Sequence, residues 1–237
     1  DHQSESNLPK AYSIINPNRL DDNSKLNYLC AAGVCFMFLI ALNSELRKIN
    51  WFKLNNIKEP NLINFLDLVS LGTVCDVVPL VGLNRAIVKQ GLKIIKNRIN
   101  IGIKTLLEIC KVDGYPSTYH LGYVIGPRIN AGGRVGKCQH GANLLLNSDA
   151  KQIFTLATEL NSYNKERQLL ESELLKNILQ NKTINSSSPI LVLHGENWHE
   201  GVIGIIASRI KEKFNKPTII ISIKENIGKA SARSVNG

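Results

Sequence analysis

The sequence predicts an α/β protein, and three patterns carry that prediction. Residues 189–223 hold an apolar segment, an amphipathic helical segment and a second apolar segment. That order is typical of a βαβ unit with parallel strands and a right-handed crossover. Residues 149–182 repeat apolar side chains at helical spacing over many turns, and residues 28–47 form another long, largely apolar helical segment.

The strands and helices follow from local signals. In the βαβ unit, Pro189–His194 and Thr218–Ile223 are the expected strands and Gly201–Phe214 is the expected helix. Lys10–Asn16 is expected as a short strand, because a strong turn signal follows it. Asn61–Val69 begins a further helix.

The long helix over residues 149–182 is a natural bridge between two domains. Ser186-Ser187-Ser188-Pro189 ends it and marks a boundary. We therefore expect a first domain at residues 1–148, a connecting helix and linker at 149–187, and a second domain at 188–237.

The net charge of +10 would suit a polyanionic partner such as nucleic acid. A biased base composition of the genome could produce the same excess. Asn84–Lys104 contains six basic and no acidic residues, and Lys89, Lys93 and Lys96 share one helical face. Such a face is either simply solvated or directed at phosphates.

Other classes of protein are disfavoured. No apolar run reaches the roughly 18 residues of a membrane span, so we expect no membrane partner. We find no signal peptide, which predicts a cytoplasmic protein. The five cysteines form no C-x-x-C pair, which argues against a disulfide framework and a zinc site.

Asp76 is the one carboxylate in the apolar stretch Leu68–Leu80 (LVSLGTVCDVVPL). Its neighbours look buried, and a buried carboxylate needs a hydrogen-bond donor, a cation or a proton. Two interpretations are open at this point. Asp76 either caps a loop or helix, or binds a metal at the end of a core element.

Leu121–Gly136 (LGYVIGPRINAGGRVG) contains five glycines, which are costly in a plain helix or strand. We expect a loop in which Arg128 and Arg134 offer planar guanidinium groups to phosphate. A purely structural turn is the alternative.

The second domain contains two further anion-binding candidates. His199 is placed at the N-terminus of the expected helix, where free N–H groups attract anions, although a simple cap is equally compatible. Gly228–Gly237 (GKASARSVNG) is expected as a loop in which Ser231 and Arg233 face phosphate.

Five stretches in order resemble the RecJ family of 5′→3′ exonucleases for single-stranded DNA, within the DHH phosphoesterase superfamily. They are Asp1-His2 with the turn at residues 14–18, LGTVCDVVPL, GPRINAGGR, WHEGVIGIIASRI and SARSVNG. The last two resemble the DHHA1 domain. The resemblance implies a partial DHH domain, with a parallel sheet and helices, joined by a long helix to a partial DHHA1 α/β domain.

The resemblance also implies two-metal hydrolysis of phosphodiesters with Mn²⁺ or Mg²⁺, in DNA repair and recombination. Asp1, His2 and Asp76 would then be catalytic metal ligands, with Asp1 either a ligand or an orienter of His2. The residues near the DNA would be Arg128, Asn130, Arg134, His199, Ser231 and Arg233. Partners implied are single-stranded DNA and unspecified repair proteins, and a monomer is expected.

Two departures from the family pattern bear on activity. Gln3 stands where the family has a second histidine, and the family's leading Asp-rich motifs are missing. We therefore expect a piece truncated at both ends and inactive alone. A non-catalytic nucleic-acid-binding relic is one alternative. A DHH phosphodiesterase for short RNA or cyclic dinucleotides is another, although SARSVNG argues against it.

Overall fold

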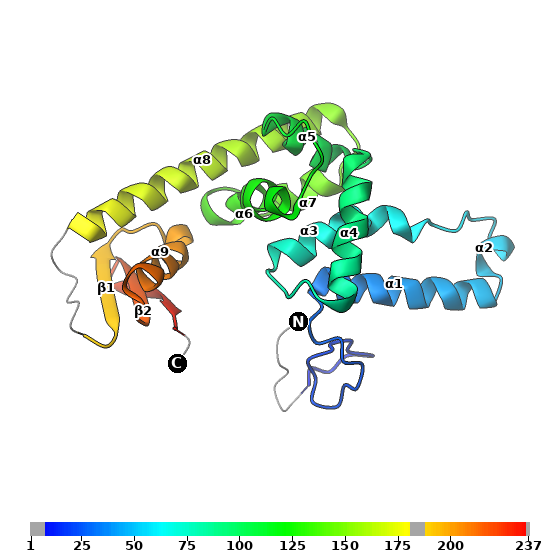
Figure 1. The fold of residues 1–237 in the computed structure, drawn as a ribbon, viewed down its shortest axis with the longest axis horizontal. Helices are drawn as coiled ribbons and strands as arrows, with labels where there is room; N and C mark the ends of the chain where they lie inside the picture. The colour runs from blue at the N-terminus through cyan, green and yellow to red at the C-terminus, as the bar shows by residue number, and fades with distance from the viewer. Residues whose placement is uncertain (1–7, 181–187, 236–237) are drawn as a thin grey trace. The chain divides into compact units, whose positions relative to one another are not determined.

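A computed structural model of the chain describes residues 8–180 and 188–235. The chain divides into two compact units, Asp1–Gly126 and Pro127–Gly237, whose elements are labelled in Figure 1. The described residues of the first unit form helices only, whereas the second unit combines helices with a sheet. The predicted α/β class is confirmed.

The first unit is built on packed helices. Its elements are α1 (Ala31–Lys48), α2 (Trp51–Leu54), the 3₁₀ helix η1 (Leu62–Phe65), α3 (Leu66–Cys75), α4 (Gly82–Lys96), α5 (Ile101–Ile109) and the π-helix η2 (His120–Ile125). Helix α3 packs against α1 and α4. Phe36, Leu66, Val69 and Ile87 form a buried cluster in this unit, which removes apolar surface from water.

The second unit contains the sheet. Its elements are α6 (Gly126–Val135), α7 (Gln139–Leu146), α8 (Ala150–Gln180), β1 (Leu191–Glu196), α9 (Glu200–Phe214), β2 (Thr218–Lys224) and β3 (Ile227–Arg233). Strands β1 and β2 are parallel, with Leu191 opposite Thr218. Strands β2 and β3 are antiparallel, with Thr218 opposite Arg233. The predicted βαβ unit and the long helix are therefore confirmed.

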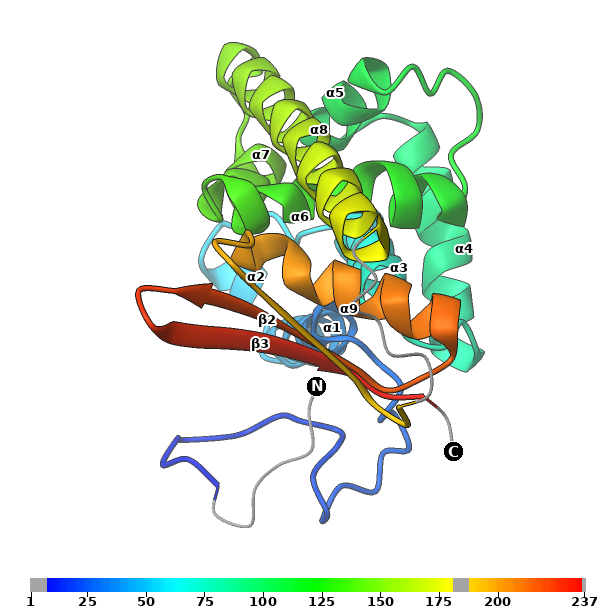
Figure 2. The same cartoon turned by 90° about the vertical axis from the view of Figure 1, so that its left-hand side faces the viewer.

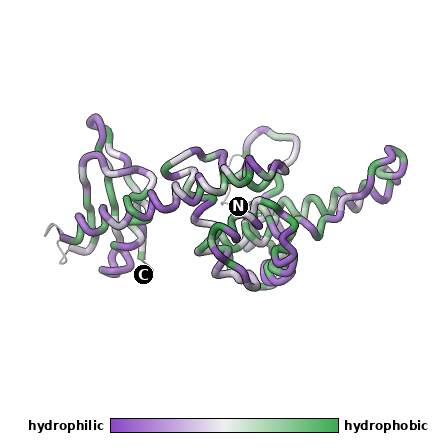
Figure 3. The backbone as a smooth tube through the Cα atoms, turned by 90° about the horizontal axis from the view of Figure 1, so that it is seen from above, coloured by the Kyte–Doolittle hydropathy of each residue, from purple (hydrophilic) through white to green (hydrophobic). Residues whose placement is uncertain are grey.

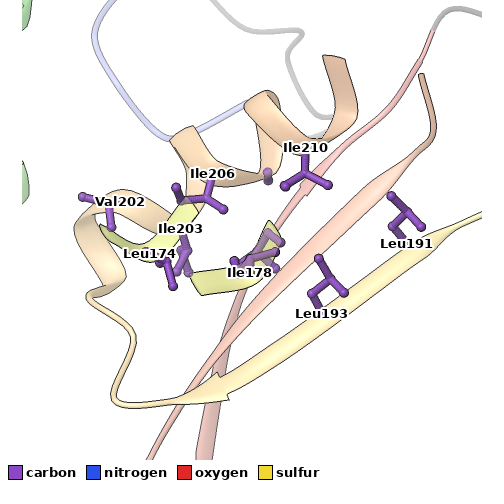
Figure 4. Packing of buried hydrophobic residues seen from close by; sticks show 10 residues of the cluster. Leu174, Ile178, Leu191, Leu193, Val202, Ile203, Ile206 and Ile210 are labelled. Carbon is purple, nitrogen blue, oxygen red and sulfur yellow. The ribbon is translucent and has the colours of Figure 1, made fainter. Parts of the chain in front are cut away.

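Helix α9 packs against β2 and β3 and also against α8 (Figure 2). Alternate residues of β1 and β2 point inward, as the two-residue period of a strand requires. They meet Val202, Ile206 and Ile210 of α9 and Leu174 and Ile178 of α8 in one buried cluster (Figure 4). This cluster fixes the first turn of α9, which is where the candidate site lies.

Two expectations about strands are wrong. Lys10–Asn16 is irregular, with the Ile14 carbonyl accepting from Arg19 Nη1 at 2.8 Å. A strand needs a neighbour to pair its backbone groups, and the described residues of the first unit offer none. For the same reason, the parallel sheet expected within residues 1–148 is not present in the described part of that range.

The glycine-rich segment Leu121–Gly136 is helical rather than a loop, because its glycines allow close packing. A Cβ added at Gly126 would lie 2.5 Å from Cys75 Sγ, and one at Gly132 would lie 2.7 Å from the Lys137 carbonyl oxygen. Glycine is therefore needed here for space, and the surrounding contacts outweigh its low helix propensity.

The predicted loop Gly228–Gly237 is also wrong over most of its described length. Ile227–Arg233 forms β3, which pairs with β2 through a tight hairpin. The turn residues Glu225 and Asn226 both have positive φ, at 51° and 61°. That conformation matches the type I′ turn favoured between antiparallel strands.

Gly91 gives a direct test of the α3–α4 packing. A Cβ there would lie 2.3 Å from the Leu66 carbonyl oxygen and 2.4 Å from Ser70 Oγ. We expect Gly91→Ala to lower the free energy of unfolding by about 1–3 kcal/mol through overpacking, as measured by urea denaturation. The control is Gly114→Ala, because a Cβ at Gly114 meets nothing within 4 Å. Equal stability of the two variants would contradict this packing.

Hydrophilic residues are interspersed with hydrophobic ones along the helices (Figure 3). None of the helices in the described part of the chain combines the length and the apolar character needed to cross a membrane.

Candidate functional site

A groove of about 800 Å³ lies in the second unit, over the first turn of α9. It is lined by Gly133, Arg134, Asn197, Trp198, His199, Glu200, Gly201, Ser222, Lys224 and Lys229. They come from the end of α6, the β1–α9 connection, the first turn of α9 and the hairpin of β2 and β3. Three of the ten are Lys or Arg and one is Glu, so positive charge is in excess and the groove is suited to an anion.

His199 is the N-cap of α9. Its Nδ1 accepts a hydrogen bond from the Gly201 backbone N–H at 3.1 Å. A neutral imidazole that accepts at Nδ1 carries its proton on Nε2, so Nε2–H is the donor of this ring. The free N–H groups and the dipole of the 15-residue helix α9 favour negative charge at the same place.

Arg134 lies against that first turn. Its Nη1 donates to the Gly201 carbonyl oxygen at 3.1 Å. Burial lowers the pKa of Arg134, and the nearby positive charges of Arg167 and Arg233 lower it further, while Glu171 acts in the opposite direction.

Arg233 and Ser231 lie on β3 beside α9. Arg233 donates from Nε to Ser208 Oγ at 3.2 Å and from Nη1 to Ser231 Oγ at 3.1 Å. Gly204 leaves room for both side chains, since a Cβ there would lie 3.2 Å from Arg233 Nη2 and from Ser231 Oγ. The hydrogen bonds hold the Arg233 guanidinium in place while its side chain stays exposed.

Lys229 of the hairpin forms an ion pair at the edge of the groove. Lys229 Nζ donates to Glu200 Oε2 at 2.6 Å, which ties β3 to the first turn of α9. Ser222 Oγ donates to the Trp198 carbonyl oxygen at 2.5 Å, which fixes the β1–α9 connection on β2. Both bonds hold the groove in shape by linking its strands to its helix.

Glu171 of α8 accepts hydrogen bonds from two arginines, Arg167 and Arg209. It is buried and accepts from Arg167 Nη1 at 2.8 Å and from Arg209 Nε at 2.8 Å. Arg167 also donates to Asn164 Oδ1, at 3.1 Å. Glu171 therefore joins α8 to α9 through the charged hydrogen bond from Arg209, while its bond from Arg167 lies within α8.

Four residues in or beside the groove were predicted from the sequence: Arg134, His199, Ser231 and Arg233. Lys224 and Lys229 of the hairpin were not predicted, and neither were the supporting residues Glu171, Arg167 and Arg209. Arg167 and Glu171 are four residues apart on a helix, a spacing that could have indicated their pairing. The roles of the lysines depend on the hairpin, which was expected as a loop.

Four predicted phosphate contacts do not line the groove: Ser231 and Arg233, which lie on β3, and Arg128 and Asn130. Arg128 donates from Nε to Asn161 Oδ1 at 2.9 Å, which ties α6 to α8. Asn130 is exposed on α6. The structure therefore gives Arg128 a packing role within the second unit.

Asp76 belongs to the first unit, where it is the C-cap of α3. Its backbone N–H donates to the Gly72 carbonyl oxygen at 2.9 Å, and its side chain is exposed. The expectation of buried neighbours is wrong for Val77, which is 86% exposed, because α3 ends at Cys75. Asp1 and His2 lie outside the described residues.

The exposed Asp76 carboxylate is a hard oxygen ligand of the kind Mg²⁺ and Mn²⁺ prefer. The residues that the structure describes contain no group of three His, Cys, Asp or Glu side chains able to hold an ion. Asp76 therefore fits a metal site in kind, but it does not make one alone.

Cys75 provides a chemical test of this region. Burial, with a smaller contribution from the Asp76 charge, raises the pKa of the Cys75 thiol to about 11. Since the thiolate is the reactive form, Cys75 should alkylate far more slowly at about pH 8 than the exposed Cys35 and Cys138. Timed iodoacetamide labelling followed by peptide mass spectrometry measures all three rates.

Because burial is the larger cause, Cys75 should stay slow in an Asp76→Asn variant. A Cys75 that reacts as fast as Cys35 in either protein would contradict the packing described for the end of α3.

Comparison with known proteins agrees with the fold. Residues 187–237 match the model of the DHHA1 domain. The chain is 40% identical to the single-stranded-DNA-specific exonuclease RecJ of Dickeya dadantii (strain 3937), over 97% of the chain and 41% of that protein. It is also 40% identical to RecJ of Escherichia coli (strain K12), over the same shares.

Solved structures give the same result. The crystal structure of RecJ from Thermus thermophilus in complex with Mg²⁺ matches 86% of this chain with a TM-score of 0.72 and 34% identity, and the match covers 30% of that chain. The Mn²⁺ complex of the same protein matches with the same score and identity. The chain thus spans about two fifths of the length of the curated relatives named above. These matches identify the chain as a homologue of the RecJ single-stranded-DNA-specific exonucleases, with residues 187–237 corresponding to a DHHA1 domain.

Proposed function

We propose that the chain is part of an exonuclease that removes nucleotides from the 5′ ends of single-stranded DNA, and that the groove over α9 holds the terminal phosphate. One observation supports the second part. Arg134 Nη1 lies 3.1 Å from the Gly201 carbonyl oxygen, and His199 caps the same first turn of α9. A guanidinium group beside the free N–H groups of a helix N-terminus is a favourable place for a phosphate.

The proposal gives each residue a role. Arg134 and Arg233 donate to phosphate oxygens as planar forks, and His199 donates from Nε2–H. Ser231 orients Arg233 through the bond between its Oγ and Nη1. Lys224 adds positive charge at the rim, where Lys229 is paired with Glu200. Arg128 and Asn130 are further proposed contacts to the DNA strand.

Metal binding belongs to the same proposal. Asp76, with Asp1 and His2, would be ligands of Mn²⁺ or Mg²⁺, which the two related crystal structures contain. Such an ion supplies an activated water and neutralises charge on the phosphodiester. A role of the parent protein in DNA repair and recombination, acting as a monomer, is the corresponding biological proposal.

Binding without hydrolysis is a second candidate for the chain by itself. It is favoured by Gln3, which stands in place of the family's second histidine.

A paired assay tests these proposals. With Mn²⁺ present, we expect the 237-residue chain to bind 5′-phosphorylated single-stranded DNA more tightly than a blunt duplex of the same length, and to release no nucleotides. Fluorescence anisotropy measures binding, and gel analysis of end-labelled DNA measures release. Equal binding to the duplex would contradict the proposed substrate, and turnover would contradict the incomplete metal site.

A further inference from the structure

Three exposed tyrosines occur close together in the sequence of the first unit. Tyr115, Tyr119 and Tyr123 are 52%, 62% and 75% exposed. The rings of Tyr119 and Tyr123 stack, with centroids 5.4 Å apart and planes 25° apart. Large aromatic surfaces left in water are unfavourable unless a partner covers them.

The local structure holds these rings in place. Tyr123 lies in the π-helix η2, a rare element that is frequent at functional sites. His120 Nδ1 accepts from the Ser117 backbone N–H at 3.0 Å, and the His120 ring meets the edge of Tyr119 with centroids 5.7 Å apart. The aromatic surface is therefore ordered before any ligand binds, which lowers the entropic cost of binding.

One exposed lysine of α4 lies over the ring of Tyr115. Lys96 Nζ lies 5.2 Å from the ring centroid of Tyr115, within cation–π range. Lys89, Lys93 and Lys96 are all exposed, and Val88 and Ile95 behind them are buried, as the helical spacing predicts. Seven residues of helix separate Lys89 from Lys96, a distance of about 10 Å.

Arg98 holds the segment that carries Tyr115 against the end of α4, which carries Lys96. Its Nη2 donates to the Val112 carbonyl oxygen at 2.6 Å, which anchors the segment after α5 at the end of α4. That anchor explains why Tyr115 meets Lys96. Tyr119 follows four residues later, at most about 14 Å of extended chain.

We propose that this surface binds single-stranded DNA through base stacking on the tyrosines and phosphate contacts to the lysines. The tyrosine–lysine strip consists of Lys89, Lys93, Lys96, Tyr115, Tyr119 and Tyr123. Aromatic platforms beside basic side chains are the general means of holding unpaired bases and their backbone. The charge fits, because Asn84–Lys104 has six basic and no acidic residues, although Asp113 stands two residues before Tyr115.

The strip belongs to the first unit, and its binding does not depend on the groove over α9 or on hydrolysis. It extends the proposed function by assigning contacts to nucleotides through their bases as well as their phosphates. A duplex hides its base faces, so the strip selects unpaired DNA.

The stacking contribution is tested with the whole chain and a fluorescein-labelled oligothymidylate. We expect Tyr119→Ala/Tyr123→Ala to bind about tenfold more weakly than the wild type by fluorescence anisotropy. Tyr12→Ala, which removes a fully exposed tyrosine of the same unit, is the control. An abasic oligomer of the same length should bind the wild type and the double variant equally. Unchanged oligothymidylate binding in the double variant would overturn the proposal.

The phosphate contribution is tested by salt dependence. Lys93→Gln/Lys96→Gln should reduce the slope of log K against log salt by about 1.4, or about 0.7 for each phosphate that is no longer neutralised. Lys53→Gln/Lys58→Gln removes the same charge from exposed positions of the same unit and should leave the slope unchanged. Equal slopes for the two double variants would overturn this part.

Two comparisons separate this proposal from its rivals. Strip variants should weaken binding of 5′-phosphorylated and 5′-hydroxyl DNA equally, so the strip can hold even if the groove shows no phosphate preference. If the strip instead joins two copies of the chain, sedimentation will show a dimer that the tyrosine double variant dissociates while its DNA affinity stays unchanged. That result would overturn DNA as the occupant.

Discussion

Arg134→Ala/Arg233→Ala is expected to weaken binding of 5′-phosphorylated single-stranded DNA by about 100-fold while changing binding of the 5′-hydroxyl form far less. Charge-assisted hydrogen bonds contribute about 1.5–3 kcal/mol each, so the loss of two costs about 3 kcal/mol or more. Both guanidinium groups lie beside α9, where the pKa of Arg134 is lowered in part by Arg233. Anisotropy with the two oligonucleotides measures the difference.

The control variant removes the same charge elsewhere in the second unit. Lys165→Ala/Lys176→Ala changes two exposed lysines of α8 and should weaken both oligonucleotides equally and slightly. Because Arg134 also donates to the Gly201 carbonyl oxygen, Arg134→Lys/Arg233→Lys is measured alongside, since it keeps the charge. Loss of the phosphate preference in the lysine variant would show that planar, forked donation matters. A retained preference in the alanine variant would contradict the proposed roles of both arginines.

Glu171→Ala is expected to lower the free energy of unfolding of the second unit by about 3 kcal/mol. The buried carboxylate accepts from Arg167 and Arg209, and its removal leaves the largely buried Arg167 without its ion-pair partner. An uncompensated buried charge has a cost of this size. The variant also releases Arg209 on α9 from α8, which loosens the helix that carries the groove.

Trp198 lies in the second unit and Trp51 in the first, so a Trp51→Phe background lets urea-induced unfolding of the second unit be followed by Trp198 fluorescence. Glu166→Ala removes an exposed carboxylate of the same helix and serves as the control. Glu171→Gln separates charge from hydrogen bonding, because it keeps one acceptor. A Glu171→Ala protein as stable as Glu166→Ala would show that the network contributes little.

The sequence was sufficient wherever the structure follows from regular periodicity. The long helix α8 and the βαβ unit were predicted from apolar spacing, because burial of one face determines both. The same reasoning placed His199 at the start of α9. The pairing of β2 with β3 was not predicted, since the positive φ of Glu225 and Asn226 is only weakly encoded by residue type.

The predictions that were wrong or missing share one physical cause. The glycines of Leu121–Gly136 were interpreted as flexibility, but Gly126 and Gly132 provide space for Cys75 and Lys137, which the local sequence does not reveal. Asp76 was expected among buried neighbours, yet α3 ends one residue earlier and exposes it. The supporting role of Glu171 depends on Arg209, which is 38 residues away in the chain. Contacts of this range are set by packing, not by local pattern.

The central claim is that the groove over α9 recognises a 5′-terminal phosphate, and titration of the wild-type chain tests it most directly. Two single-stranded oligonucleotides of identical sequence, one with a 5′-phosphate and one with a 5′-hydroxyl, are compared by isothermal titration calorimetry at one salt concentration. We expect the phosphorylated strand to bind at least about tenfold more tightly, corresponding to about 1.4 kcal/mol. Equal dissociation constants for the two strands would contradict recognition of the phosphate by this groove.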